Sequence, residues 1–356
     1  MLLRASEVEV SVALTKCAVV RYGNATTADL WAAWAKAAAS TGDIEDFPGV
    51  MSKWTEQMGF PLLTLKSAPT LDGEGNVMLS LSQKWFLADG SEATEADGPV
   101  KLWPIPVFVQ LAGDAACTDA AAVPPRMVLM PAVADYELSL PFDGAEAPRW
   151  VKLNAGQHVP LRVCYPAEMA PLLAEDGVRK CQLGAADRIG LLSDTSALVT
   201  AGAAEPTALL TLLASYGETE EDATVWSMVL ERISALCSLS GYSADGGALV
   251  GSMRSWGRGI VLEKLSKIGW SPCEADGHLT RKLRGELIGL LPAMCAGAGA
   301  DEAVVAALVE CRSRFETFSA SPEDAASKEA LPSEYQAAVY KMLLVNDCGC
   351  DTVVQL

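Results

Sequence analysis

A change in the spacing of apolar residues near position 166 most constrains the fold of this 356-residue chain. Before it, apolar residues alternate with polar or small ones. Val77, Leu79 and Leu81 share one side of an extended segment, and the stretches 105–111 and 136–140 repeat the pattern. Side chains of a strand point alternately to its two faces, so this spacing predicts short strands with one buried face each. We expect a small β-sandwich over residues 61–165.

After residue 166 the apolar spacing becomes helical and stays so. Pro206 and Pro322 stand where first helical turns are expected, and the first turn tolerates proline. Short connections rich in glycine or proline separate the helices that we predict at 183–201, 206–217, 222–239, 245–269, 278–296, 301–318 and 333–347. This series predicts a helical-repeat array or an irregular bundle over 166–356, although the sequence has no strict period.

The first sixty residues are also predicted to be helical. Thr26 or Thr27 caps one helix, and a second short helix runs from Gly49 to Met58, followed by Gly59 as a stop signal. The predicted fold class is therefore a multidomain α+β protein, whose domain boundaries we place at 1–60, 61–165 and 166–356.

Composition narrows the function classes. The net charge of -18 disfavours binding to nucleic-acid phosphates. The sequence has no run of about 18 apolar residues and no apolar stretch behind Met1, so neither a membrane span nor a secretory signal is predicted. Ten cysteines are spread singly along the chain, which is typical of thiols in a reducing compartment. We expect a cytoplasmic protein that contacts neither nucleic acid nor membrane.

The chain carries no recognisable catalytic motif. Its two histidines, His158 and His278, are 120 positions apart, and neither His-Glu-x-x-His nor Cys-x-x-Cys nor Gly-x-Ser-x-Gly occurs. The acidic run 220–222 is interpreted as charge that complements the start of a helix. Arg254 and Arg258, which flank Trp256, are interpreted as a solvated helix face. The sequence thus predicts no catalytic, cofactor-binding or metal-ligating residue.

Several segments nevertheless resemble one known family in its order. Residues 22–31 and the Trp-Thr-x-Gln-x-Gly-Phe-Pro string at 54–61 look like the end of the catalytic domain of gluzincin aminopeptidases, the puromycin-sensitive and endoplasmic-reticulum types. The similarity continues through segments that resemble the family's β-sandwich and helical domain, at 81–86, 103–106, 150–154, 187–194, 268–270, 277–279, 283–284 and 333–344.

The resemblance implies a helical remnant of a zincin catalytic domain, a β-sandwich and part of a helical cap domain. In this family a zinc-bound water attacks the first peptide bond, but the motifs that hold zinc and the substrate amine are missing here. We therefore expect the C-terminal, non-catalytic portion of a zinc-dependent aminopeptidase, inactive by itself. Zinc is expected only in a full-length protein. The implied partners are peptides, through the helical cap, and the missing catalytic domain.

The chain also departs from the family pattern. Residues 157–162 replace a Gly-aromatic-aromatic-Arg segment, in which only Arg162 and then Tyr165 fit, and Pro160 predicts a short or bulged final strand. About half of the family's helical domain is expected to be missing, and Met1 is expected to be an internal methionine. The alternative is a stand-alone peptide- or protein-binding module, a catalytically dead regulator. An independent enzyme that uses a carboxylate pair is a third hypothesis, but no spacing selects such a pair.

Overall fold

The computed structural model describes residues 26–38, 46–114, 126–217, 219–242, 244, 247–298 and 301–346. Parts of the predicted domains 1–60 and 166–356, among them residues 22–25 and 347–356, lie outside these ranges. The chain forms two compact units. The first, called the sheet unit, comprises Met1–Leu173 and Ser193–Glu205; the second, the helical unit, comprises Ala174–Leu192 and Pro206–Leu356. The predicted division into three domains stays a prediction.

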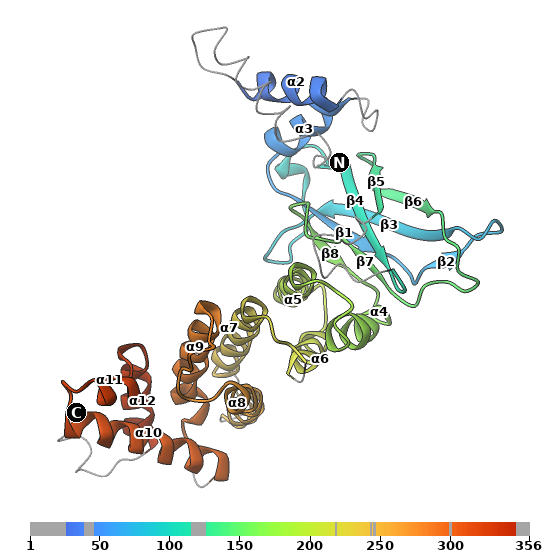
Figure 1. Cartoon of the computed structure of the whole chain (residues 1–356). Helices are drawn as coiled ribbons and strands as arrows, with labels where there is room; N and C mark the ends of the chain where they lie inside the picture. Colours follow the sequence, from blue (N-terminus) through green and yellow to red (C-terminus); the bar gives the residue numbers. More distant parts are fainter. Residues whose placement is uncertain are drawn as a thin grey trace. The chain divides into compact units, whose positions relative to one another are not determined.

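The sheet unit contains two β-sheets (Figure 1). The first has the order β2-β3-β1-β8, with β6 paired to β3; its strands are β1 (Pro61–Leu65), β2 (Thr70–Leu71), β3 (Val77–Trp85), β6 (Asp135–Leu140) and β8 (Arg162–Cys164). The second has the order β5-β4-β7, built from β4 (Ile105–Leu111), β5 (Arg126–Met130) and β7 (Val151–Leu153). All pairs are antiparallel except β1 with β8.

The alternating pattern predicted the long strands correctly. Val77, Leu79 and Leu81 of β3 are fully buried, and Leu79 lies opposite Leu138 of β6. β4 departs from strict alternation because Phe108 and Gln110 are buried as well. The final strand β8 is short and begins after Pro160, as the missing backbone donor of proline predicts.

Among the described residues of the sheet unit, two helices precede the strands, α2 (Thr27–Ala38) and α3 (Phe47–Glu56). Thr26 and Asp29 cap α2 reciprocally: the Asp29 backbone N–H donates to Thr26 Oγ1 (3.3 Å) and the Thr26 N–H donates to Asp29 Oδ2 (3.0 Å). α3 begins two residues earlier than predicted because Asp46 accepts the N–H of Gly49 (3.0 Å) and acts as its N-cap.

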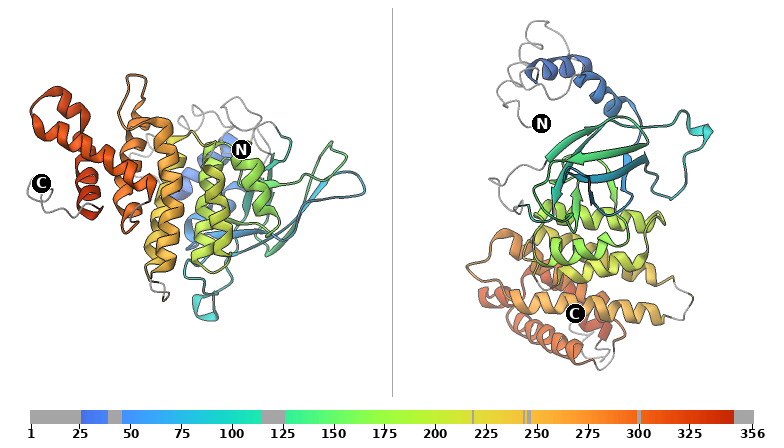
Figure 2. Two further views of the ribbon diagram at one scale, coloured as in Figure 1. Left: turned by 90° about the horizontal axis from the view of Figure 1, so that it is seen from below. Right: turned by 90° about the vertical axis from the view of Figure 1, so that its right-hand side faces the viewer.

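The predicted long helices are confirmed within a few residues. They are α5 (Ala185–Thr200), which contributes residues to both units, and α6 (Pro206–Tyr216), α7 (Ala223–Ser240), α8 (Ala248–Ile268), α9 (His278–Cys295), α10 (Glu302–Ala320) and α12 (Ser333–Asn346) of the helical unit. In the helical unit α7, α8 and α9 pack side by side, and α9 also packs on α12 (Figure 2).

Pro322 is not in a first helical turn as predicted, because it lies in a turn before Asp324, the N-cap residue of the short helix α11 (Ala325–Ala330). The other short irregular elements had no sequence signal that we identified; they are α4 (Met169–Leu172), the π-helix η2 (Leu173–Arg179) and the 3₁₀ turn η1 (Glu95–Asp97). Within the ranges described, no helix combines the length and apolarity needed to cross a bilayer.

Candidate functional site

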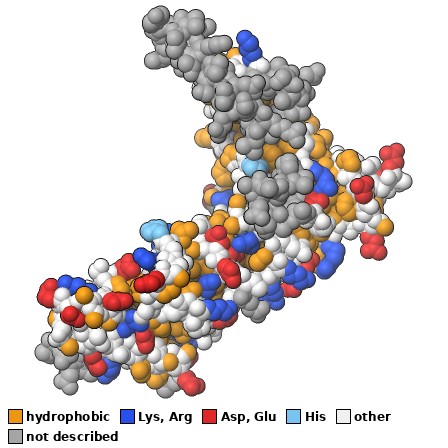
Figure 3. Space-filling model, in the orientation of Figure 1, with side chains coloured by type: hydrophobic (Ala, Val, Ile, Leu, Met, Phe, Trp, Pro, Cys, Tyr) orange, Lys and Arg blue, Asp and Glu red, His pale blue; other side chains and the backbone are white. Residues whose placement is uncertain are grey.

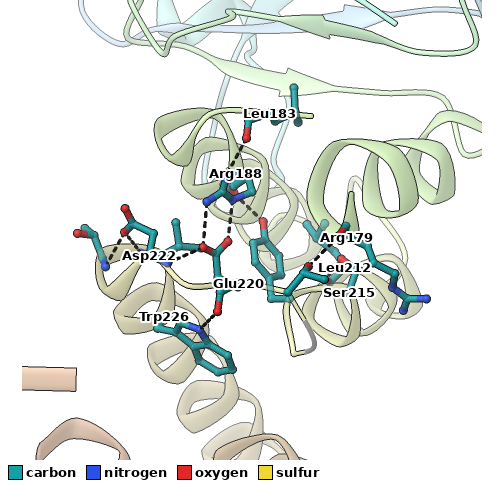
Figure 4. A network of polar contacts seen from close by, with 12 residues as sticks. Arg179, Leu183, Arg188, Leu212, Ser215, Glu220, Asp222 and Trp226 are labelled. Atoms are coloured by element: carbon teal, nitrogen blue, oxygen red, sulfur yellow. Dashed lines mark hydrogen bonds and ion pairs between the residues drawn. The ribbon is translucent and has the colours of Figure 1, made fainter. Parts of the chain in front are cut away.

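A polar network in the helical unit surrounds a buried ion pair between Arg188 of α5 and Glu220, which lies before α7 (Figure 4). Arg188 Nε lies 2.7 Å from Glu220 Oε2, and Arg188 Nη2 lies 2.9 Å from Glu220 Oε1. The third guanidinium nitrogen, Nη1, donates to the carbonyl of Leu183 (2.6 Å). Such a two-point arrangement fixes both direction and distance, which is what a planar guanidinium offers a carboxylate.

Three further helices contribute donors to this network. Tyr216 Oη, at the end of α6, donates to the carbonyl of Arg188 (2.6 Å). The carbonyl of Glu220 accepts from both Trp226 Nε1 of α7 and Lys264 Nζ of α8, each at 2.8 Å. The network therefore connects α5, α6, α7 and α8 through groups that are almost completely buried.

The electrostatics of the network favour a fixed structural role. Burial opposes the charge of Arg188, but its hydrogen bond and attraction to Glu220 outweigh that cost and raise its pKa. Burial also raises the pKa of Tyr216 and lowers that of Lys264. Because Arg188 and Glu220 use their charged atoms on each other, the pair holds helices together and does not offer a reactive group.

The interpretation of residues 220–222 is thus confirmed for one residue and wrong for another. Asp222 is the N-cap of α7 and accepts the N–H groups of Thr224 (2.8 Å) and Val225 (3.1 Å). Glu220 instead is 4% exposed and belongs to the buried ion pair. Its partner in the ion pair is 32 positions away, so local sequence gave no signal for it.

The predicted solvated face at 254–258 is wrong for Arg258. Its side chain is buried, with Nη1 donating to the carbonyl of Met294 (3.1 Å) and Nη2 paired with Asp301. Asp301 is also the N-cap of α10, so the ion pair connects α8 to the start of α10, while the hydrogen bond to Met294 connects α8 to the end of α9. Arg254 is only partly buried, and its Nη1 approaches the carbonyl of Ala296 at 3.4 Å.

A third arginine, Arg284 of α9, brings together segments that resemble the aminopeptidases. Its Nε and Nη2 donate to the carbonyls of Gly269 (2.9 Å), the C-cap residue of α8, and Ile268 (3.0 Å), its last residue. Nη2 also lies 2.7 Å from Asp276 Oδ2. A cation at a helix C-terminus satisfies unpaired carbonyls and complements the helix dipole. Residues 268–270 and 283–284 are thus joined by structural contacts.

The same holds for the Trp-Thr-x-Gln-x-Gly-Phe-Pro string of the sheet unit. Trp54 Nε1 donates to the carbonyl of Pro104 (2.8 Å), and Gln57 Nε2 donates to the carbonyl of Leu102 (3.3 Å). Gly59, at φ +93°, lies directly against Trp85, since an ideal Cβ there would fall 2.1 Å from Trp85 Nε1. The segments 54–61, 81–86 and 103–106 therefore meet at one place, where they anchor α3 to the strands.

Arg162 and Tyr165, the two residues that fit the family pattern, also have structural partners. Arg162 Nη1 contacts Ser193 Oγ (2.7 Å) and Asp194 Oδ1 (3.1 Å), while Asp194 Oδ2 accepts the N–H of Val163 (3.2 Å). Tyr165 Oη accepts the backbone N–H of Leu153 (2.9 Å). Burial raises the pKa of Asp194 to about 6, against the opposing influence of the nearby cations.

The histidines do not form a zinc site. His158 is exposed and its ring packs at a tilt against Phe108 (centroids 4.8 Å apart) in the sheet unit, whereas His278 is the exposed first residue of α9 in the helical unit. Among the residues with described positions, no group of three His, Cys, Asp or Glu side chains could hold a metal ion. The described residues therefore offer no tetrahedral set of ligands that fits zinc.

Comparison with known proteins gives one family. The profile of the ERAP1-like C-terminal domain matches residues 150–355. The chain is 29% identical over 324 residues to Aminopeptidase M1-A of Oryza sativa subsp. japonica, which covers 91% of this chain and 32% of the relative.

The chain is also similar to aminopeptidases from a fungus and an animal. Over 320 residues the chain is 27% identical to the Alanine/arginine aminopeptidase of Saccharomyces cerevisiae, covering 90% of this chain and 32% of the relative. It is 31% identical over 216 residues to the Puromycin-sensitive aminopeptidase of Caenorhabditis elegans, covering 61% and 20%. The chain thus spans about a third or less of the length of these relatives.

Proposed function

The chain belongs to the ERAP1-like C-terminal domain family, and from this premise we propose that it is the C-terminal, non-catalytic portion of a zinc-dependent aminopeptidase. The full-length form would remove N-terminal residues from peptides. Relatives named as aminopeptidases, each much longer than this chain, support the proposal.

The contacts of the family-like segments are the structural observation that best supports this proposal. The described segments that resemble the aminopeptidases make buried or partly buried structural contacts: Trp54 with Pro104, Arg188 with Glu220, and Arg284 with the end of α8. Such contacts stabilise a scaffold, and they do not assemble a nucleophile, a general base and a site for a reacting atom. A scaffold portion is the role that these residues support best.

The partners that we propose follow from the same role. The helical unit would serve as a cap toward peptides, and the chain would act together with a zinc-containing catalytic domain. On the face shown in Figure 3, acidic and basic side chains are interspersed over the described surface. No observation favours the alternative of a stand-alone binding module, and a cytoplasmic location stays a prediction.

The decisive experiment is to read the native transcript upstream of the Met1 codon. We expect the reading frame to continue and to encode a helix with His-Glu-x-x-His, followed by a further Glu. In a zinc peptidase the two histidines of this helix bind zinc and its Glu is the general base. A stop codon directly upstream, together with detection of the short product in cells, would overturn the proposal.

A biochemical experiment complements this one. The purified 356-residue chain, assayed with an aminoacyl-coumarin substrate and added zinc, is expected to release no more fluorophore than buffer does. The longer product of the same gene serves as the positive control. Chelator-sensitive hydrolysis by the short chain, with one bound zinc per molecule, would contradict the non-catalytic role.

A further inference from the structure

An exposed turn between α10 and α11 carries a serine whose hydroxyl is available. Ser321 is the C-cap residue of α10, and its carbonyl accepts the N–H of Asp324 (3.0 Å), which closes a β-turn over 321–324. Pro322 occupies the second position of this turn, where its fixed φ is favoured. Residues 319–326 are all exposed. Among the residues with described positions, none forms a hydrogen bond with the Ser321 hydroxyl.

The other serine that precedes a proline has its hydroxyl engaged. A Ser-Pro pair occurs in the sequence only at 271–272 and 321–322, and Thr-Pro does not occur. Ser271 is also exposed, but its Oγ accepts from Arg314 Nη2 (2.9 Å). The same guanidinium donates to the carbonyl of Ala330 (2.7 Å), so the first pair belongs to a network of structural contacts. The two pairs therefore differ in whether the hydroxyl is free to react.

The backbone at Ser321 suits the substrate groove of a protein kinase, which binds its acceptor residue in an extended conformation. Ser321 has an extended φ of −153°, in agreement with the bias of a residue before proline. The N–H of Ser321 to the carbonyl of Phe318 (3.3 Å) and the Asp324 N–H are the backbone hydrogen bonds at this residue. Few bonds thus need to break for the exposed segment to open into a groove.

Proline after the acceptor serine selects one class of kinase. Because Pro322 has no N–H, the groove needs no acceptor at that position. We propose that Ser321 is the phosphorylation site of a proline-directed protein kinase, and that the phosphate loosens the contact between α10 and α11. In the transfer, Ser321 Oγ attacks the γ-phosphorus of ATP, the catalytic Asp of the kinase takes the hydroxyl proton, and ADP leaves with the electron pair of the broken P–O bond.

The expected loosening follows from the charges around the turn. Ser321 lies at the C-terminus of α10, the negative end of the helix dipole, and the acidic residues Glu323 and Asp324 follow in the same turn. Lys328 already pairs with Glu323 (3.1 Å). A phosphate placed there is repelled by its surroundings. Since α10 and α11 pack on each other, their contact should weaken. This inference is independent of the proposed enzymatic role.

Incubation of the purified full chain with ATP and a mitogen-activated protein kinase tests the site. We expect one phosphate per chain, which tandem mass spectrometry places on Ser321. Ser321→Ala should abolish the modification, whereas Ser271→Ala, the matched control, should leave it unchanged. A phosphate on Ser271 or Ser319 would overturn the proposal. So would an unmodified chain, whether or not a peptide of residues 315–327 is phosphorylated in the same assay.

A proline substitution tests the class of kinase. Pro322→Ala introduces an N–H that the groove leaves without an acceptor, so we expect phosphorylation by the same kinase to slow about tenfold. Pro332→Ala is the matched control, because Pro332 follows α11 and leaves residues 319–326 unchanged. Equal rates for the two variants would contradict a proline-directed site.

Amide hydrogen exchange of the phosphorylated and unmodified chains tests the structural effect. We expect the amides of residues 316–327 to exchange about fivefold faster after phosphorylation, and those of α7 to be unaffected. Unchanged exchange at the end of α10 would overturn the proposed loosening of its contact with α11.

Discussion

Arg188 and Glu220 form a buried two-point ion pair, with nitrogen–oxygen distances of 2.7 and 2.9 Å, between α5 and the residues before α7. The side chains are 10% and 2% exposed. Each charge is stabilised by the other in place of the water that burial has removed. Removing one partner therefore costs much more unfolding free energy than the intact pair contributes as a net favourable contact.

Glu220→Gln is therefore expected to destabilise the helical unit strongly. The substitution keeps the size of the side chain but leaves the Arg188 charge buried without a counter-charge, which costs about 3–5 kcal/mol. Urea unfolding followed by circular dichroism measures the loss. Glu221→Gln is the control, because Glu221 is exposed, and it should change the unfolding free energy by less than about 0.5 kcal/mol. Similar effects of the two substitutions would show that the ion pair does not stabilise the fold.

Two glycines of α8 should respond to alanine in opposite directions. An ideal Cβ at Gly257 would lie 2.7 Å from Ile233 Cγ2 and 3.2 Å from Met294 Sδ, so Gly257→Ala must displace these side chains of α7 and α9 away from α8. We expect a loss of about 1–3 kcal/mol. Gly259 has open space around its Cβ position, and Gly259→Ala should stabilise by about 0.5–1 kcal/mol through helix propensity.

Thermal unfolding of both variants, compared with the unchanged chain, checks this pair of expectations. The two positions lie in the same helix, so propensity acts alike on both and only packing differs. A rise in melting temperature for Gly257→Ala would contradict the close approach of α7, α8 and α9 at this residue.

Local sequence patterns were sufficient to predict where the long helices and strands lie, but not which strands pair with one another. The helices between 206 and 346 were predicted within a few residues, because apolar spacing marks a helix and glycine or proline marks its ends. The parallel pairing of β1 with β8 was not predicted, since its partners Leu63 and Val163 are 100 positions apart. Strand pairing over such distances depends on tertiary packing that no local pattern records.

The buried arginines show the same limit for the polar residues. Arg258 and Glu220 have the sequence surroundings of exposed helix residues, yet Asp301 and Arg188 lie against them from distant parts of the chain. Whether a charged side chain is buried depends on such a partner. The resemblance to aminopeptidases singled out residues 187–194 and 283–284, but their contacts, and hence their structural role, became evident only from the fold.

The ionisation of Asp194 should make stability depend on pH. Burial raises its pKa from 3.8 to about 6, so the folded protein binds a proton near pH 5 that the unfolded chain does not bind. Its contribution to the unfolding free energy therefore increases as the pH falls from above 6 to below 4, by on the order of 3 kcal/mol. Above pH 6 the buried carboxylate remains charged and its cost is constant.

Asp194→Asn isolates this effect, because asparagine does not titrate. We expect the unfolding free energy of the unchanged chain, relative to that of the variant, to rise on acidification from pH 7 to pH 4. If the ion pair with Arg162 instead held the pKa of Asp194 below 3.8, the relative stability would not rise over this range and would fall on further acidification. Denaturant titrations at several pH values distinguish the two signs.

Cysteine reactivity offers a test of packing in the helical unit. Cys295 and Cys311 are 0% and 1% exposed, and burial raises their pKa values to about 11 and about 12. Since the thiolate is the reactive form, both should resist iodoacetamide at pH 8 in the folded protein. Cys273 is exposed in the loop after α8 and serves as the internal control. Peptide mass spectrometry should show alkylation of Cys273 within minutes and of the buried pair only after urea is added.

Early modification of Cys311 would mean that α10 opens on that timescale. Its packing against α12 would then be much weaker than the burial of Val304 and Phe315 implies.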